Sequence, residues 1–557
     1  DGVEDIGKQF ETFFGPAIGE GSYEDFWYSG NEAELFKNRF GPETKPSTKT
    51  NSGANSLINF ENFSAVSNKM SFKLSYGSGN IKPVSVTDLN LTAGKKFLTP
   101  ILTDGAPLIS VTDNMRSIRY DVNGVLKSVL PNFSSSIPAS SGFNQIGTDG
   151  KILKLRGMTA LDYQFLSDIS APVVMDQSGV NGKIYIGTAD GHIYVSNPIG
   201  ELLNFVPFSF QEVISRLNET VKQISANPDY VSAITQNYFA DSKGNLIHLS
   251  SPTIKLISFL DSSSKPFSVV LTENNEFHII SEGKTEKKFA VSPESVITDF
   301  SMADLFGDGN NYLLISNGKN LEAYNINGDP AKNFPFTIGR EENFTGAPLV
   351  LDLKNDGTAV VIGYTNSGTI YAFNPSTGKP EDGFPLSTGV QFSLNPVLLK
   401  EELPAMGPMP VYKPYLAAVD ITNRLYVWNL SPVQGKSFWS GVFGDEGNSS
   451  FAGAPSKSNQ PQEFFPSDKA YNWPNPVYGG ETRIRYYVSE NSNVNIKIFD
   501  LAGELVIEFN DRATGGMDNE TSWDVSRIES GIYYARLDLK SESGASANKT
   551  IKIAVIK

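Results

Sequence analysis

The sequence predicts an all-β chain, a β-propeller of about seven blades followed by an immunoglobulin-like (Ig-like) β-sandwich. Three observations predict this architecture. One unit of short apolar runs and tight turns is stated twice between Val296 and Gly389. The chain contains 49 Gly and 32 Pro, as many tight turns require. The C-terminal residues 467–557 carry a separate set of alternating strands.

The composition limits the classes of protein to consider. At 557 residues, with 39% hydrophobic side chains, the chain is long enough for two or three packed domains. A net charge of −15 disfavours nucleic-acid and anionic-membrane partners, which select basic patches. The absence of cysteine rules out disulfides, thiolate metal sites and cysteine nucleophiles. No apolar run approaches the roughly 20 residues of a membrane span.

The twin repeat defines the predicted blade. Each copy reads as an apolar strand, an Asp-Gly turn, a second apolar strand, a polar turn, a strand carrying Tyr and a Phe-Pro exit. The copies align at four positions, namely Asp304 with Asp352, Asp308 with Asp356, Tyr324 with Tyr371 and Phe334 with Phe384. Four short strands at a period of about 40–50 residues are typical of a propeller blade.

Weaker copies of this unit flank the twin repeat. They span residues 97–133, 171–208, 232–249, 254–291 and 394–438, and the last one closes on Phe438-Trp439. We therefore assign residues 81–456 to the propeller, and we expect the third strand of each unit to pack between neighbouring blades. One stretch breaks the pattern, because Phe210 to Ala226 places its apolar residues at helical spacing and predicts an amphipathic helix.

The unit resembles the FG-GAP and quinoprotein-like propeller repeats of secreted bacterial proteins. In the FG-GAP family an Asp-rich loop binds calcium through carboxylate oxygens. That resemblance makes four carboxylates candidate calcium ligands, Asp304, Asp308, Asp352 and Asp356. Calcium is the one cofactor that the sequence suggests. The middle ligand position holds Phe306 in one loop and Lys354 in the other, so the alternative is an Asp-Gly turn closed by a capping carboxylate.

Residues 1–80 form an N-terminal arm rich in Gly, aromatic and acidic residues. Within it, Met70, Phe72 and Leu74 alternate with polar residues and predict a half-buried strand. The arm resembles the end of the peptidase domain of immune-inhibitor-A-like metalloproteases. The matching residues are Pro46, Ser52-Gly53, Leu57-Ile58, Asn62 to Ser64 and Met70 to Phe72. A generic extended arm that leads into a β-domain is the alternative.

The zinc motif of that protease family, His-Glu-x-x-His, is absent from this sequence. The three histidines are far apart, at His192, His248 and His278. The resemblance therefore implies that any catalytic part lies upstream of Asp1. Because the sequence starts at Asp1 without Met, we expect either a mature form or the processed C-terminal part of a longer precursor.

A polar linker at residues 457–466 leads to the predicted Ig-like domain at 467–557. Its alternating strands are predicted at 482–488, 494–498, 532–536 and 551–555. This part is similar to FlgD-type Ig-like domains and to the C-terminal sorting domain of type IX secretion cargo. The residues that match are Pro474 to Pro476, Ile498 to Asp500, Gly503, Trp523-Asp524, Ser530 to Tyr533 and Lys552 to Lys557. The resemblance implies export across an outer membrane, and a plain adhesive sandwich is the alternative.

No catalytic motif appears in the sequence, which lacks a Gly-x-Ser-x-Gly elbow, a Walker loop and a His-based metal pair. We therefore predict a non-catalytic scaffold, secreted or displayed on the outer surface of a bacterium. Its partner would be a protein or a surface glycan, and a cleaved N-terminal protease-like chain is one such protein. Two alternatives stay open, a carbohydrate-active hydrolase or lyase built on the propeller and a calcium-dependent adhesin.

Overall fold

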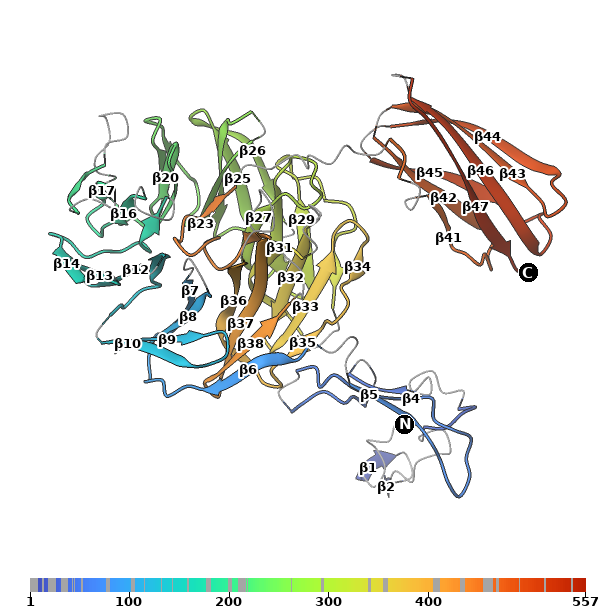
Figure 1. Ribbon diagram of the computed structural model, residues 1–557, viewed down its shortest axis with the longest axis horizontal. Coiled ribbons are helices and arrows are strands. Elements are labelled where there is room, and N and C mark those ends of the chain that lie inside the picture. Colours follow the sequence, from blue (N-terminus) through green and yellow to red (C-terminus); the bar gives the residue numbers. More distant parts are fainter. Residues whose placement is uncertain are drawn as a thin grey trace. The chain divides into compact units, whose positions relative to one another are not determined.

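The computed structural model is all-β, as the sequence predicts, since every regular element among the described residues is a strand (Figure 1). The structure describes residues 9–12, 15–18, 27–31, 39–42, 44, 46–51, 54–76, 81–101, 106–114, 116–131, 133–142, 144–157, 160–176, 182–198, 203–208, 217, 219–261, 263–291, 295–338, 342–353, 359–403, 411–430, 436–453, 464–466, 470–489, 491–514, 517–541 and 544–557. The chain divides into two compact units, Asp1–Lys457 and Ser458–Lys557. No long apolar helix that could cross a membrane occurs among these residues.

Eight of the sheets described in the first unit are built on antiparallel blade strands, and we number them as blades 1 to 8. Blade 1 contains β7 (Phe97–Ile101), β8 (Leu108–Thr112), β9 (Arg116–Asp121) and β10 (Leu126–Pro131). Blade 2 contains β11 (Ala139–Ser141), β12 (Asn144–Asp149), β13 (Ile152–Arg156) and β14 (Ala160–Gln164). Blade 3 contains β15 (Val174–Met175), β16 (Ile184–Gly187), β17 (Ile193–Ser196) and β18 (Phe205–Pro207). Blade 4 contains β19 (Gln223–Asn227), β20 (Tyr230–Ile234), β21 (Tyr238–Asp241) and β22 (Leu246–His248).

The second half of the ring has the same organisation. Blade 5 contains β23 (Thr253–Leu260), β24 (Pro266–Thr272), β25 (Glu276–Ser281) and β26 (Lys284–Ala290). Blade 6 contains β27 (Ile297–Ala303), β28 (Tyr312–Asn317), β29 (Asn320–Tyr324) and β30 (Phe336–Thr337). Blade 7 contains β31 (Phe344–Asp352), β32 (Val360–Thr365), β33 (Thr369–Asn374), β34 (Lys379–Pro380) and β35 (Leu386–Ser387). Blade 8 contains β36 (Phe392–Leu403), β37 (Val411–Asp420), β38 (Arg424–Asn429) and β6 (Pro83–Asp88).

The first strands of the blades form a closed ring around one axis. The contacts run from β36 to β7, β11, β15, β19 and β23 in turn, and from β27 through β31 back to β36. Blades 5 and 6 join through an ion pair between Lys255 in β23 and Asp299 in β27. The structure is therefore a propeller of eight blades, one more than the repeats in the sequence indicate.

The extra blade is blade 2, at residues 139–164. Its first strand has only three residues, and its buried positions include Ser140, Gln145, Thr148 and Lys154 in place of aliphatic side chains. Hydrophobic alternation, which identified the other units, is therefore weak in this blade.

The ring closes between distant parts of the chain. The outer strand of blade 8 is β6, which precedes blade 1 in the sequence and pairs with β38. We expected Phe438-Trp439 to close the last unit, and that prediction is wrong. The strand that contains them, β39 (Lys436–Trp439), pairs instead with β31 at the axis.

The helix predicted from Phe210 to Ala226 is also contradicted where the structure describes it. Residues 209–216 and 218 lie outside the described residues, but residues 219–222 are not helical and Gln223–Asn227 forms β19. Val221 and Ile224 are buried in the propeller core. Pairing with β20 decides the conformation here, and the side chain of Asn227 accepts hydrogen bonds from two amides of the hairpin turn.

Aromatic side chains of the third strands pack between blades, as predicted. Phe373 in blade 7 stacks on Phe336 in blade 6, with ring centroids 4.2 Å apart. Tyr324 in blade 6 lies against Phe289 in blade 5 at 5.8 Å. These contacts join each blade to its neighbour by burying apolar area on both sides.

The N-terminal arm contains a hairpin and a small three-stranded sheet. The hairpin pairs β1 (Gln9–Thr12) with β2 (Gly15–Ile18), and the sheet has the order β3 (Arg39–Phe40), β4 (Ile58–Glu61), β5 (Lys73–Tyr76). A strand forms where Met70 to Leu74 predicts one, but it begins only at Lys73, and the expected half-burial is wrong because Met70, Phe72 and Leu74 are all exposed. Within the described chain, no further strand covers this side of the sheet.

The second unit is a sandwich of two antiparallel sheets. One sheet contains β41 (Tyr471–Trp473), β42 (Glu481–Val488) and β45 (Met517–Asp524). The other contains β44 (Leu505–Ala513), β43 (Ser492–Phe499), β46 (Gly531–Ser541) and β47 (Ser546–Val555). Trp523 is fully buried between the sheets and packs edge-on against Tyr533. The predicted Ig-like class is confirmed, although in β46 the buried positions are Tyr533, Ala535 and Leu537 rather than their even-numbered neighbours.

Candidate functional site

The propeller axis is the first place to look for a site, because propellers commonly bind ligands there. In this protein the axis holds residues 436–452, which we call the axial segment. Its first strand, β39, runs antiparallel to β31, and its last, β40 (Phe451–Ala452), runs parallel to β23. Since β23 and β31 are equivalent inner strands, the segment enters and leaves at the same end of the axis.

Between its two strands the axial segment is hydrogen bonded to the inner strands around the ring. Amides of five inner strands donate to its carbonyls, Leu398 to Ser440 (2.8 Å), Ser140 to Glu446 (2.7 Å), Met175 to Gly447 (2.8 Å), Ala226 to Ser449 (3.0 Å) and Ser258 to Ser450 (3.0 Å). Counting its pairing with β31, the segment is hydrogen bonded to blades 2, 3, 4, 5, 7 and 8, and β39 also contacts β27 of blade 6. It therefore occupies the space in which an axial ligand would lie.

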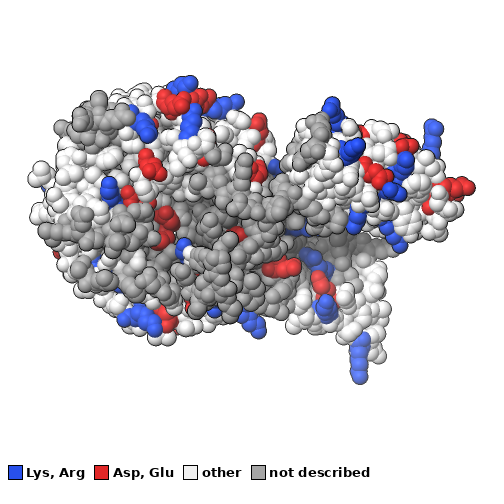
Figure 2. All heavy atoms as spheres, turned by 45° about the horizontal axis from the view of Figure 1, so that its top comes forward, with Lys and Arg blue, Asp and Glu red and all other residues white. Residues whose placement is uncertain are grey.

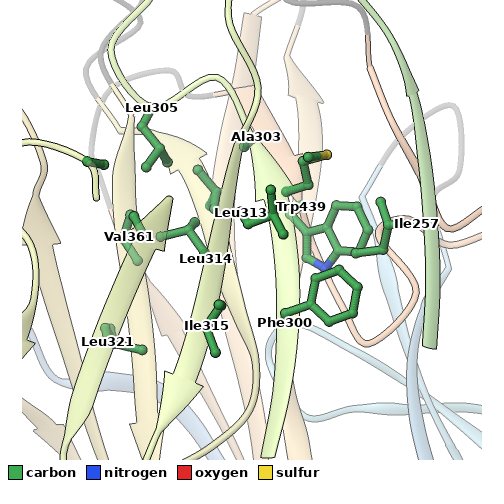
Figure 3. Packing of buried hydrophobic residues seen from close by; sticks show 14 of the residues in the cluster. Ile257, Phe300, Ala303, Leu305, Leu313, Leu314, Ile315, Leu321, Val361 and Trp439 are labelled. Carbon is green, nitrogen blue, oxygen red and sulfur yellow. The ribbon is translucent and has the colours of Figure 1, made fainter. Parts of the chain in front are cut away.

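The core of the axial segment is Trp439, which is fully buried. Figure 3 shows its indole next to Phe300 of blade 6 and Ile257 of blade 5, within the largest hydrophobic cluster. The buried ammonium of Lys255 lies 5.9 Å from the indole ring. The carbonyls of Phe300 and Val442 each accept a hydrogen bond from that ammonium at 2.9 Å, and the Asp299 carboxylate does so at 2.6 Å. Lys255 thus ties the segment to two blades.

Two neighbouring carboxylates, Asp445 and Glu446, lie on the axial segment. The Ser449 amide and hydroxyl donate to the Asp445 carboxylate at 2.9 and 2.5 Å. Burial raises the pKa of both groups, and the Asp445 charge raises that of Glu446 further, to about 7. Glu446 therefore titrates near neutral pH.

Glu446 predicts a pH dependence of stability. Because folding raises its pKa from 4.5 to about 7, its contribution to stability is complete below pH 4.5 and is lost as the pH rises through 7. We expect Glu446→Gln to be more stable than the wild type at pH 8 by about 1–2 kcal/mol, and the gap to shrink towards pH 5. Urea unfolding from pH 5 to 8 measures this, with exposed Glu282→Gln as the control. Parallel pH profiles for wild type and Glu446→Gln would contradict the prediction.

The described calcium candidates do not lie in one place, since Asp304 and Asp308 share a turn and Asp352 ends β31. Amides of Phe306, Gly307, Asp308 and Gly309 donate to the Asp304 carboxylate at 2.8–3.3 Å. The Asp308 carboxylate accepts from the Asn310 amide and from the Tyr312 hydroxyl. Asp352 is buried at the end of β31, and Asp356 lies outside the described residues. Among the described side chains, no three His, Asp or Glu groups are close enough to hold a metal.

Calcium binding by the Asp304 turn stays a prediction with a direct test. We expect Asp304→Ala to destabilise the propeller by about 1–2 kcal/mol in EDTA, because four amides lose their acceptor. If the turn also binds calcium, adding 2 mM calcium (about tenfold above a typical extracellular Kd) stabilises the wild type but not the variant. An equal stability difference in EDTA and calcium would leave only the capping role.

The three histidines do not come together. His192 in blade 3 contacts Asp190 at 3.1 Å, His248 in blade 4 packs against Tyr238, and His278 in blade 5 lies 3.8 Å from Glu276. Burial lowers the pKa of His278, which favours its neutral form. Each histidine has its own local partner, so the histidines do not form a shared site.

The N-terminal arm is anchored on blade 7 by buried polar contacts. The carboxylate of Glu342 is fully buried, accepts hydrogen bonds from Thr369 and Tyr371, and lies 3.7 Å from the Lys49 ammonium. The Asn55 amide donates to the Thr369 hydroxyl at 3.1 Å. Sequence reasoning missed this site, because a single Lys in a polar loop gives no sign that it is buried.

Comparisons with solved structures give distant similarities. BBS1N in its complex with ARL6DN is 10% identical, covers 63% of this chain and 98% of its own, and has a TM-score of 0.38. Raptor from Chaetomium thermophilum is 12% identical and has a TM-score of 0.38. The match covers 64% of this chain and 29% of Raptor. The Dos1 propeller is 10% identical and has a TM-score of 0.40. The match covers 65% of this chain and 94% of the Dos1 propeller.

Comparisons of sequence concern the second unit. No curated protein matches the chain significantly. Residues 472–553 match the family model described as a secretion system C-terminal sorting domain. This domain confirms the export expected from the sequence, and it indicates that the protein is secreted and attached to the surface of a bacterial cell.

Proposed function

We propose that this exported propeller is a non-catalytic binding and assembly scaffold that holds a protein partner on its outer surface. The occupied axis carries the proposal. The channel that would take a small ligand is filled by residues 436–452, so recognition is left to the outside of the propeller and to the arm. A large partner suits such surfaces better than a small substrate does.

The N-terminal arm offers the surface that best suits a protein partner. Phe72 and Leu74 are 52% and 60% exposed, and Val66 and Met70 lie exposed in the same segment. The Phe72 ring packs against Phe60 and Phe63 at 5.3 and 5.7 Å, so the exposed face is held in place. Exposed apolar clusters of this kind mark interaction sites on soluble proteins. We name Val66, Met70, Phe72 and Leu74 the arm face.

Crosslinking in the native cell envelope tests the scaffold. We expect one protein to crosslink to the arm face and to be lost from the double variant Phe72→Asp/Leu74→Asp. The matched control is Leu166→Asp, because Leu166 is 88% exposed on the propeller and outside the arm. If no protein crosslinks to the arm, or if both variants lose it equally, the scaffold proposal fails.

The finer proposal is that this chain derives from a metalloprotease-like precursor and that the partner is its cleaved protease-like part. The resemblance of residues 46–72 to the end of such a peptidase domain supports it. Mass spectrometry of the crosslinked protein, with the gene sequence upstream of Asp1, decides it. A partner with His-Glu-x-x-His encoded in the same gene agrees with this origin, and a partner from another gene contradicts it while leaving the scaffold intact.

The rival function is a carbohydrate-active hydrolase or lyase. Such an enzyme on a propeller needs carboxylates around an accessible channel mouth, and here Trp439 and its neighbours fill the axis. Assays with the polysaccharides of the native envelope test this rival directly, since release of reducing ends or unsaturated products would favour it over the scaffold.

A further inference from the structure

The sorting domain has a groove that neither its export role nor the propeller explains. The groove has a volume of about 760 Å³ and lies on the sheet formed by β44, β43, β46 and β47. Its lining residues are Asn493, Val494, Asn495, Asn510, Asp511, Arg512, Asp538, Leu539, Lys540, Ser546, Ala547 and Asn548.

Strand register places eight of these polar side chains in two rows across the sheet. One row contains Asn510, Asn495, Asp538 and Asn548, and the next contains Arg512, Asn493, Lys540 and Ser546. Alternate residues of a strand point to the same face, so both rows face outward. Val494 and Leu539 belong to the core of the sandwich, so they can line the groove only with backbone atoms. The groove is therefore a polar grid on the outer face.

Part of the hydrogen-bonding capacity of this grid is already used, and part is open. The Asn495 amide donates to Glu508 at 2.5 Å and to Asn510 at 2.8 Å. The side chains of Asn493, Lys540 and Asn548, in contrast, make no hydrogen bond to any side chain or backbone group in the described structure. These three exposed residues, on neighbouring strands, are available to a ligand.

The charges of the groove balance. Asp511 and Asp538 are matched by Arg512 and Lys540. The molecular face drawn in Figure 2 likewise shows basic and acidic side chains among each other on its described surface. A charged ligand would therefore meet as much repulsion as attraction. The side-chain amides of Asn493 and Asn548 can both donate and accept hydrogen bonds. Neighbouring strands lie about 4.8 Å apart, which is close to the length of one sugar ring.

We propose that this groove binds a neutral oligosaccharide chain, whose hydroxyls both donate and accept hydrogen bonds along the two rows. This site is independent of the proposed role of the propeller. Because no aromatic ring is among the described residues that line the groove, each contact replaces a bond to water and adds little, so we expect a Kd of about 0.1–1 mM.

Isothermal titration of the full chain tests the proposal. The probes are the neutral hexasaccharides of glucose (α-1,4 and β-1,4), mannose and xylose, with hexagalacturonate as the anionic comparison. We expect at least one neutral probe to bind, and Asn493→Ala/Asn548→Ala to weaken that binding at least tenfold. Thr550→Ala is the matched control, because Thr550 is exposed on β47 but does not line the groove.

Three results would overturn the proposal. One is that none of the neutral probes binds at 5 mM (about fivefold above the weakest expected Kd). Another is that the double variant binds as tightly as the control. The third is tighter binding of hexagalacturonate than of every neutral probe, which would make Arg512 and Lys540 an anion site. An unchanged melting temperature of the variants shows that the sorting domain stays folded.

Discussion

Lys255→Ala is expected to destabilise the propeller by about 3–5 kcal/mol, the effect of leaving a buried charge without its partner. The ammonium is almost fully buried and lies 2.6 Å from the Asp299 carboxylate. It also donates to the carbonyls of Phe300 and Val442, which would be left without that donor. Removing the ammonium therefore releases both the junction of blades 5 and 6 and the axial segment.

Calorimetry of the full chain measures this effect, because the sandwich is a separate compact unit that serves as an internal reference. Lys265→Ala is the matched control, since Lys265 pairs with Glu282 in blade 5 at 3.4 Å but the two side chains are 33% and 65% exposed. The double variant Lys255→Met/Asp299→Asn should recover much of the loss, because it removes both charges together. If the control and Lys255→Ala cost the same, the buried pair does not hold the axis.

Trp439→Ala is expected to cost about 3–5 kcal/mol, because it leaves a cavity at the centre of the propeller. The side chain is fully buried among Phe300, Ile257 and neighbouring core residues (Figure 3). Its indole Nε1 has no hydrogen-bond partner among the described atoms. Trp439→Phe should therefore cost clearly less, since it fills part of the space and removes an unsatisfied donor.

The comparison with Trp473→Ala makes this prediction specific. Trp473 is exposed in the sorting domain, and its removal should leave the unfolding of the propeller unchanged. Limited proteolysis provides a second measurement, since loss of Trp439 should make the chain near residues 440–453 accessible to protease. A small loss of stability in Trp439→Ala, together with unchanged proteolysis, would show that the axial segment does not depend on this anchor.

Local pattern determined much of the fold. The apolar runs of the twin repeat predicted the strands β27, β28, β31 and β32. Alternation in 482–488 and 494–498 predicted two strands of the sandwich with the correct buried faces. These features depend on residues close together in the chain, so their periodicity records which face is buried. The matches from Pro474 to the C-terminal lysines were likewise local, and they pointed to the sorting domain.

Tertiary structure alone decided the closure of the ring, the eighth blade and the occupied axis. The β6 strand pairs with β38 across more than three hundred residues of sequence, and Ser225 donates to Ser450 from 225 residues away. Lys255 is buried because Asp299 and two carbonyls surround it, which its neighbours in sequence do not reveal. Contacts between distant segments leave no periodic signal in either segment, so the sequence predicted a propeller but not what fills its centre.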